Sequence, residues 1–213
     1  MRFENAYFFN GTAYAGKSTL VKELARKYDG IACEENYHNA LLPQLDQKEF
    51  PGLTYTRDLQ DWHDFIRRTP DEYEAWIRRT SQECERLELM LLEGLCRQGK
   101  PVFVDTNISV DTLKQIANPR HVLIMLADPD ISVRRFFERP DREKQFLYRL
   151  LLEEENPSRA IENFRRCLAR INSRKNYDAF LHSGFQVLLR DESRTIPETL
   201  ALAEKMLGLN ETV

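Results

Sequence analysis

The feature that most constrains the fold of this chain is a short loop bracketed by two glycines near its start. Residues 11–18 read Gly-Thr-Ala-Tyr-Ala-Gly-Lys-Ser, which matches the pattern G-x-x-x-x-G-K-[ST]. The preceding run Ala6–Asn10 is short and apolar, as in a buried strand, and Leu20, Leu24 and Tyr28 then recur at helical spacing. The chain is therefore expected to begin with a strand, a tight loop and a helix.

Each fixed position of this pattern has a physical reason. Gly11 and Gly16 can adopt backbone angles that a Cβ atom would forbid, so that successive N–H groups can turn inward toward an anion. Lys17 would neutralise the β- and γ-phosphates of a nucleotide, and the Ser18 hydroxyl would reach Mg²⁺. A helix that starts at Lys17 adds the positive end of its dipole. The nucleotide-binding residues expected from the pattern are Gly11, Thr12, Ala13, Tyr14, Ala15, Gly16, Lys17, Ser18 and Thr19.

The composition is consistent with one domain of 213 residues, of which 42% are hydrophobic and 31% charged. A net charge of −3 gives little attraction to nucleic acid, so no nucleic-acid partner is expected. No apolar run approaches the length of a membrane span, and cleavage of a signal peptide would destroy a loop that begins at Gly11. We therefore expect a cytoplasmic protein with no membrane partner.

Cysteine usage agrees with a reducing compartment. The four cysteines lie far apart and form no C-x-x-C pair, which favours free thiols over zinc ligands or a redox pair. They are Cys33, Cys84, Cys96 and Cys167.

Short apolar runs alternate with longer periodic segments, which predicts an α/β fold with a mainly parallel sheet. Several helix starts carry a capping residue followed by proline or by a glutamate that completes a capping box, at Thr69–Glu72, Asp128–Pro129, Asn156–Pro157 and Thr195–Glu198. The five expected strands are Ala6–Asn10, Ile31–Cys33, Val102–Asp105, His121–Ala127 and Phe185–Leu189.

Two long helical segments lie outside the minimal sheet, at residues 36–99 and 128–182 of a single domain spanning 1–213. Ligands of open α/β sheets bind beyond the carboxyl ends of the strands. Segments inserted at those ends can form the walls of a binding site for a second substrate, and they can close as a lid over the first substrate. Aromatic residues in the first segment repeat at helical spacing, which favours core packing over stacking on a ligand. They are Trp62, Phe65, Tyr73 and Trp76.

Asp105 ends the third expected strand and is the candidate partner of Ser18 in holding Mg²⁺. The alternative is that Asp105 only caps the helix that begins near Ser109. Asp128 also follows an apolar strand, but its neighbour Pro129 makes helix capping the better explanation there.

Glu34 and Glu35 follow the second expected strand, where a carboxylate could accept a proton from a substrate hydroxyl or orient the acceptor. In an extended segment they point to opposite sides, so only one of them faces the site. The alternative is an exposed acidic loop. His38 is interpreted as a loop residue rather than a catalytic base.

Arginines follow the fourth expected strand, and there we expect Arg139 to act on the transferred phosphoryl group and Arg135 and Arg142 to bind the nucleotide. The alternative is a solvated helix face with salt bridges. Arginines of the first helical segment could contact a substrate phosphate, although most are expected to be surface charge. They are Arg57, Arg67, Arg68, Arg78 and Arg79.

These landmarks resemble the small P-loop kinases of the nucleoside-monophosphate-kinase and shikimate-kinase-like group. The resemblance rests on the loop Gly11–Ser18, the acidic turn Glu34–Asn36, the strand that ends at Asp105, and Leu126–Pro129 leading into an arginine-bearing segment. It implies a five-stranded parallel sheet of order 2-3-1-4-5 between helical layers, an acceptor-binding insert, and a helical lid. It also implies ATP and Mg²⁺ as cofactors and lid closure during phosphoryl transfer.

Some motifs of the individual subfamilies are missing. After Asp105 comes Thr-Asn, where many nucleoside-monophosphate kinases have Gly-x-Pro-Arg. The glycine-rich turn of shikimate kinases and the Asp-Arg-Ser motif of deoxynucleoside kinases are also absent from the sequence. The expected function is ATP-dependent phosphorylation of a hydroxyl or phosphate of a small metabolite such as a nucleoside, nucleotide or shikimate-like compound. The alternative is a regulatory ATPase whose output is a binding event.

Overall fold

Five strands form one parallel sheet in the computed structural model, which describes residues 3–138 and 142–209. The spatial order is β2-β3-β1-β4-β5, and every neighbouring pair is parallel. The α/β architecture, the five strands and their order are therefore as predicted. The strands are β1 (Ala6–Gly11), β2 (Ile31–Cys33), β3 (Val102–Asp105), β4 (Val122–Leu126) and β5 (Gln186–Leu189).

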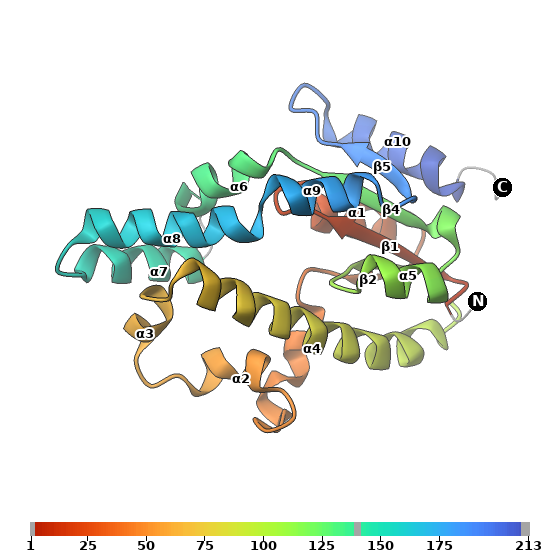
Figure 1. Cartoon of the computed structure of the whole chain (residues 1–213). Helices are drawn as coiled ribbons and strands as arrows, with labels where there is room; N and C mark the ends of the chain where they lie inside the picture. The colour runs from red at the N-terminus through yellow and green to blue at the C-terminus, as the bar shows by residue number, and fades with distance from the viewer. Residues whose placement is uncertain (1–2, 139–141, 210–213) are drawn as a thin grey trace.

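Helices cover both faces of this sheet (Figure 1). One apolar cluster joins the sheet to α1 (Lys17–Lys27) and α10 (Ile196–Leu207). A second cluster joins the opposite face to α5 (Val110–Ile116), α9 (Arg174–Leu181) and the carboxyl-terminal half of α4 (Pro70–Cys96). Both faces of the sheet are thus buried, which is why its strands read as continuous apolar runs rather than as alternating sequences.

The central strand shows how one segment supplies both clusters. Phe8 and Phe9 are fully buried, yet Phe8 belongs to the cluster with α5 and Phe9 to the cluster with α1. Successive side chains of a strand point to opposite faces, so two adjacent phenylalanines can fill two different layers. This central strand leads directly into the glycine-bracketed loop.

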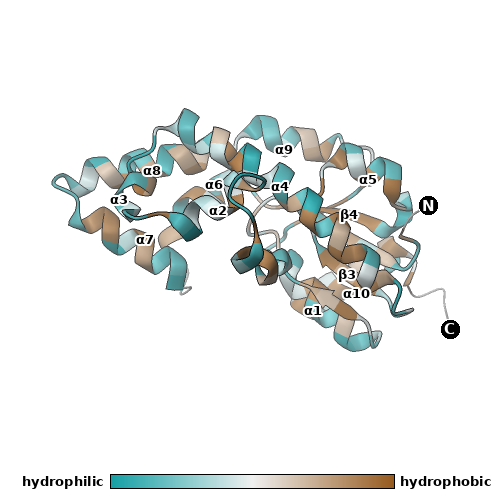
Figure 2. Cartoon of the chain, turned by 90° about the horizontal axis from the view of Figure 1, so that it is seen from below, coloured by the Kyte–Doolittle hydropathy of each residue, from teal (hydrophilic) through white to brown (hydrophobic). Residues whose placement is uncertain are grey.

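The remaining helices extend from the carboxyl edge of the sheet and lie to the left in Figure 1. In Figure 2 these helices are banded in brown and teal, as expected of helices with one apolar face. They are η1 (Tyr37–Gln44), α2 (Pro51–Asp58), α3 (Trp62–Ile66), α6 (Pro129–Arg135), η3 (Phe136–Glu138), α7 (Arg142–Glu153) and α8 (Pro157–Ile171), while η2 (Pro119–His121) leads into β4.

Aromatic packing joins the two long helical segments into one body. The ring of Phe65 lies 5.1 Å from Trp76, 5.9 Å from Tyr73 and 6.4 Å from Phe164, measured between centroids. Phe164 belongs to α8, whereas the other three residues come from α3 and α4. Core packing of these insert aromatics is confirmed, since Phe65 and Tyr73 are almost completely buried and the tryptophans pack against the same cluster.

The structure changes the boundaries of the two predicted segments. Segment 36–99 includes the carboxyl-terminal half of α4, and segment 128–182 includes α9, but both of these parts cover the sheet. The reason is that helix periodicity locates an apolar stripe without saying which partner will bury it. The body beyond the sheet, which we call the helical extension, is formed by α2, α3, the first half of α4, α6, η3, α7 and α8.

The helix caps that the sequence predicts are present in the structure. The Thr69 hydroxyl accepts a hydrogen bond from the backbone N–H of Glu72, and the Glu72 carboxylate accepts one from the backbone N–H of Thr69. The Asp128 carboxylate accepts from the backbone N–H of Asp130 at 2.8 Å, so Asp128 is a cap as expected. Within residues 3–138 and 142–209, no helix combines the length and the apolar character needed to cross a membrane.

Candidate functional site

The Gly11–Ser18 loop joins β1 to α1 with the backbone geometry that its glycines allow. Gly11 has a φ of 123°, and a Cβ atom there would overlap the backbone carbonyl of Met125. Gly16 has a φ of 93° at the N-cap of α1. Tyr14 also has a positive φ, of 64°, and Arg190 donates a hydrogen bond to the Tyr14 carbonyl. Of these three residues only Tyr14 is strained by its positive φ, because glycine adopts such angles freely.

Lys17, Ser18 and Asp105 meet at the end of this loop. The Ser18 hydroxyl donates a 2.7 Å hydrogen bond to Asp105 Oδ2. Lys17 Nζ donates to the Thr12 carbonyl at 3.0 Å and lies 3.8 Å from Asp105 Oδ1. Residues 87 positions apart in sequence are brought together because β1 and β3 are neighbouring parallel strands.

Asp105 is a buried carboxyl group, with only 4% of its surface exposed. Burial raises its pKa, while the Lys17 cation and the Ser18 hydrogen bond act in the opposite direction. Asp105 does not cap the following helix, because the N-cap of α5 is Ser109, whose hydroxyl accepts from the backbone N–H of Thr112. The alternative interpretation, in which Asp105 only caps the helix that begins near Ser109, is therefore wrong.

The acidic turn after β2 separates its two glutamates. Glu34 pairs with Lys22 Nζ at 2.8 Å, with about half of each side chain exposed, and does not line the cavity described next. Glu35 lines a cavity together with Lys17, Ser18 and Asp105. The chain turns sharply at Asn36, which has a φ of 61°. Of the two candidates, Glu35 is the one beside the loop.

A cavity of about 500 Å³ lies on this side of the loop, and we call it the Asp105 cavity. Its floor is the loop itself, and its walls come from the turn after β2, β3, α6, η3 and the segment after β5. It is lined by Ala13, Tyr14, Gly16, Lys17, Ser18, Thr19, Glu35, Asp105, Arg135, Glu138 and Arg190.

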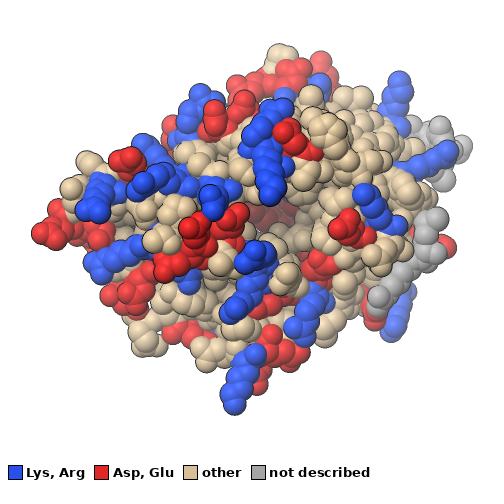
Figure 3. All heavy atoms as spheres, in the orientation of Figure 1, with Lys and Arg blue, Asp and Glu red and all other residues tan. Residues whose placement is uncertain are grey.

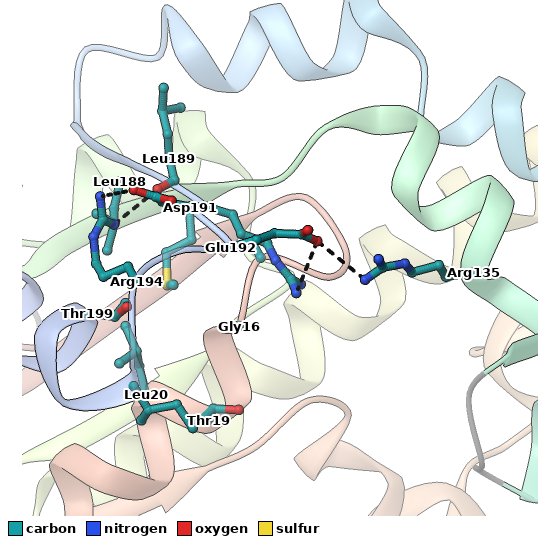
Figure 4. A pocket seen from close by; sticks show the side chains of 14 residues that line it. Gly16, Thr19, Leu20, Arg135, Leu188, Leu189, Asp191, Glu192, Arg194 and Thr199 are labelled. Atoms are coloured by element: carbon teal, nitrogen blue, oxygen red, sulfur yellow. Dashed lines mark hydrogen bonds and ion pairs between the residues drawn. The ribbon is translucent and has the colours of Figure 1, made fainter.

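A second cavity of about 500 Å³ lies on the other side of Gly16 and Thr19, and we call it the Leu188 cavity (Figure 4). Leu20, Met125, Leu188, Leu189 and Ile196 give it apolar walls. Leu189 and Ile196 are about half exposed, so these walls are accessible. Its polar rim consists of Arg135, Arg190, Asp191, Glu192, Arg194 and Thr199.

Arg135 and Arg190 are shared by the two cavities. Both guanidinium groups are near the Glu192 carboxylate, at 3.4 Å for Arg135 and 3.9 Å for Arg190. Figure 4 shows Arg135 pointing toward Glu192 across the mouth of the Leu188 cavity. The two arginines therefore stand at the junction of the cavities, next to the loop.

The other predicted lid arginines are not part of this arrangement. Arg142 is exposed at the start of α7 and lines neither cavity. Arg139 lies outside the residues that the structure describes. Arg190 was missed by the sequence reasoning, although a run of charged residues directly after the fifth strand marks the same carboxyl edge of the sheet.

A buried polar network behind Asp105 was also missed. Glu88 of α4 is fully buried and accepts hydrogen bonds from the Thr106 hydroxyl at 2.6 Å and from the Asn107 backbone N–H at 3.0 Å. His38 Nδ1 lies 3.4 Å from Glu88, and His38 Nε2 lies 3.2 Å from the Cys84 thiol. His38 is thus a buried link between the turn after β2 and α4, and no signal in the sequence distinguished Glu88 from the other charged residues of that helix.

The oxygen donors at Ser18 and Asp105 suit a hard divalent cation such as Mg²⁺. Their side chains lie side by side in the Asp105 cavity next to Lys17. In the described part of the chain, no group of three or more His, Cys, Asp or Glu side chains could hold a metal ion. A cation here would therefore depend on these two side chains, a bound phosphate and water.

Positive and negative side chains are interspersed over the face of the molecule shown in Figure 3. No continuous basic stripe crosses this face, in agreement with the net charge of −3.

Comparison of the chain with protein-family models, with curated proteins and with solved structures finds no match. The loop, the two cavities beside it and the side chains that line them are what point to a function.

Proposed function

We propose that this protein is an ATP-dependent phosphotransferase of the P-loop type that acts on a small molecule. The observation that supports the proposal most is the meeting of Lys17, Ser18 and Asp105 at the end of the Gly11–Ser18 loop. A cationic amine, a hydroxyl and a carboxylate at the amino end of a helix match the needs of a triphosphate with its cation.

The nucleotide would lie across the loop, with its base in the Leu188 cavity and its phosphates in the Asp105 cavity. The apolar side chains of Leu188, Leu189 and Ile196 suit a planar ring, and Thr199 and Asp191 offer polar edges. The two cavities share Gly16 and Thr19, which supports one ligand bridging both.

A bound Mg²⁺ would supply positive charge to the phosphate oxygens, held by Ser18 and Asp105. The residues of the chain have their own roles. Lys17 would neutralise the terminal phosphates, and the loop N–H groups would fix their position. Arg135 and Arg190, at the junction of the cavities, would stabilise charge on the group being transferred.

Glu35 would face the acceptor. It is a carboxylate in the same cavity as Lys17 and Asp105, where it can accept a hydrogen bond from a substrate hydroxyl or take its proton. The acceptor class is a small metabolite with a hydroxyl or phosphate group, such as a nucleoside, nucleotide or shikimate-like compound. A cavity of about 500 Å³ has the size of ordinary small-molecule sites.

The test is incubation of the purified protein with ATP, Mg²⁺ and pooled metabolites, followed by mass spectrometry for phosphorylated products. Lys17→Ala is expected to abolish transfer and to leave the fold intact. Lys22→Ala is the matched control, because Lys22 belongs to the same helix but pairs with Glu34 on the outside. Full activity of Lys17→Ala would refute the proposal, and phosphate release that no acceptor changes would favour the regulatory ATPase instead.

A further inference from the structure

A cavity of about 580 Å³ lies in the helical extension, between α2, the turn after α3 and the first half of α4. We call it the Arg68 cavity. None of its lining residues lines the Asp105 or the Leu188 cavity. The residues that matter here are Tyr55, Arg67, Arg68, Trp76 and Arg79, together with Asp64 and Glu72.

Arg68 is held by aromatic rings rather than by a carboxylate. Its guanidinium carbon lies 4.0 Å from the centroid of Tyr55 and 5.3 Å from that of Trp76. The face of an aromatic ring attracts the cation. It does not accept the hydrogen bonds that the N–H groups donate in the plane of the guanidinium group. Arg68 Nη1 is buried and has no hydrogen-bond partner among the described residues. A buried donor left without an acceptor is unfavourable, so the fold leaves the Arg68 guanidinium group short of one acceptor.

The cavity is lined by three arginines, Arg67, Arg68 and Arg79, and by two carboxylates, those of Asp64 and Glu72. Arg67 is bound to Glu154 at 3.0 Å, while Arg79 is exposed and has no ion pair within residues 3–138 and 142–209. On the acidic side, Glu72 accepts from the backbone N–H of Thr69 at 2.8 Å and serves as a helix cap. Two guanidinium groups, those of Arg68 and Arg79, are thus available to an anion.

We propose that the Arg68 cavity binds a small molecule that carries a phosphate group, as a site separate from the Gly11–Ser18 loop. A phosphate dianion matches two guanidinium groups in charge and in hydrogen-bond geometry better than a monovalent carboxylate does. Trp76 and Tyr55 line the same space and give the organic part of the ligand an apolar surface. The site does not depend on the proposed transfer reaction.

The experiment uses Trp76 as the reporter. The chain has two tryptophans, so Trp62→Phe leaves Trp76 as the only indole in the protein. Phenyl phosphate, inorganic phosphate and benzoate are titrated into this variant without nucleotide while the fluorescence is recorded. We expect a saturable change with phenyl phosphate at a dissociation constant of about 1 mM or below, and weaker binding of benzoate.

Two substitutions and two controls locate the site. Arg79→Gln alters only an exposed side chain, and it is expected to weaken binding about tenfold without changing the melting temperature. Arg68→Gln is expected to abolish binding. Arg78→Gln is the control on the same helix, because Arg78 lines a different cavity next to Ile171. Lys17→Ala is expected to leave binding unchanged, which separates this site from the nucleotide site.

Absence of a saturable change with phenyl phosphate in the Trp62→Phe variant would overturn the proposal. Equal binding of benzoate and phenyl phosphate would overturn the phosphate assignment. Binding that Arg79→Gln leaves intact, or that Lys17→Ala removes, would locate the ligand elsewhere and overturn it as well. If Arg68→Gln fails to fold, the Arg79→Gln and Arg78→Gln pair still decides the outcome.

Discussion

The hydroxyl of Thr106 donates a 2.6 Å hydrogen bond to the carboxylate of Glu88. Thr106 directly follows Asp105, and the side-chain amide of Asn107 donates to the same carboxylate at 2.9 Å. A fully buried side chain of α4 therefore fixes the segment that leaves β3. The position of the Asp105 carboxylate depends on a helix that belongs to another layer of the molecule.

Replacing Glu88 with glutamine should lower the free energy of unfolding by about 2–4 kcal/mol, because a buried acceptor of several hydrogen bonds becomes partly a donor. Urea unfolding measures this change. Glu85→Gln is the matched control, since Glu85 accepts from Ser109 one turn earlier on a more exposed face of α4. Its cost should be about 1 kcal/mol or less. Equal losses in the two variants would contradict a special role for Glu88.

The two glutamates after β2 should differ sharply in their effect on activity. Glu35→Gln is expected to lower the rate of phosphoryl transfer by about 10²–10⁴, as for loss of a general base. Glu34→Gln should leave the rate nearly unchanged, because Glu34 pairs with Lys22 at the surface. Turnover with a saturating acceptor measures the contrast. Should Glu34→Gln prove the more damaging, the assignment of Glu35 to the site is wrong.

Arg190 should matter for nucleotide affinity. Its guanidinium group donates to the carbonyl of Tyr14 within the loop and lines both neighbouring cavities. Arg190→Gln removes a charge-assisted hydrogen bond, so the dissociation constant for Mg-ATP should rise about tenfold or more. Calorimetry measures it. Arg174→Gln provides the comparison, since Arg174 pairs with Asp178 on α9 and its loss should leave the affinity unchanged.

The shared aromatic core of the helical extension should unfold as one unit. Phe65→Ala is expected to cost about 3–5 kcal/mol, as for other buried phenylalanines. Because Phe164 packs against Phe65, hydrogen exchange should accelerate in α8 as well as in α3 and α4. Met90→Ala, at a position that is 66% exposed, is the control and should change neither stability nor exchange. Faster exchange confined to α3 would mean that the helices are not coupled.

Stability should depend on pH through Glu154. Hydrogen bonds from Arg67, and to a smaller extent from His63, lower the pKa of Glu154 below its ordinary value of 4.5. The folded state therefore favours the ionised carboxylate, and this contribution is present above pH 4.5 and is lost as the pH falls through the lowered pKa. Glu154→Gln should lower the free energy of unfolding by about 1 kcal/mol near neutrality.

Melting curves of the wild type and Glu154→Gln across this pH range provide the check. The difference between the two proteins should shrink toward zero once the pH lies below the lowered pKa of Glu154. A difference that persists unchanged into acid would show that packing, rather than ionisation, is what the substitution removes.

Local sequence signals were sufficient to predict the five strands and the residues at the centre of the candidate site, whereas the strand order was implied by the family resemblance. β4 (Val122–Leu126) is a run of five buried apolar residues that ends before Asp128-Pro129. Its existence is visible in the sequence, although the predicted range His121–Ala127 is one residue too long at each end. Asp105 could be predicted because it ends an apolar run, while Asp128, which follows another such run, is explained as a helix cap by its neighbour Pro129. In each case the signal is carried by residues adjacent in sequence.

What could not be predicted depends on contacts between distant segments. The choice between Glu34 and Glu35 is made by Lys22 of α1, which holds Glu34 at the surface, and by the turn at Asn36. Glu88 is one of several charged residues on α4, and only its burial against Thr106 distinguishes it. Sequence patterns indicate an apolar face but do not say which distant segment will cover it.

The continuity of α4 has a mechanical consequence. This helix runs unbroken for 27 residues, a length of about 40 Å at the usual rise per residue. Its amino end forms a wall of the Arg68 cavity. Farther along the helix, Glu88 accepts a hydrogen bond from Thr106, the residue after Asp105. The helix is therefore a rigid link between the Arg68 cavity and the end of β3. A tilt of its amino end would displace the residues that follow Asp105.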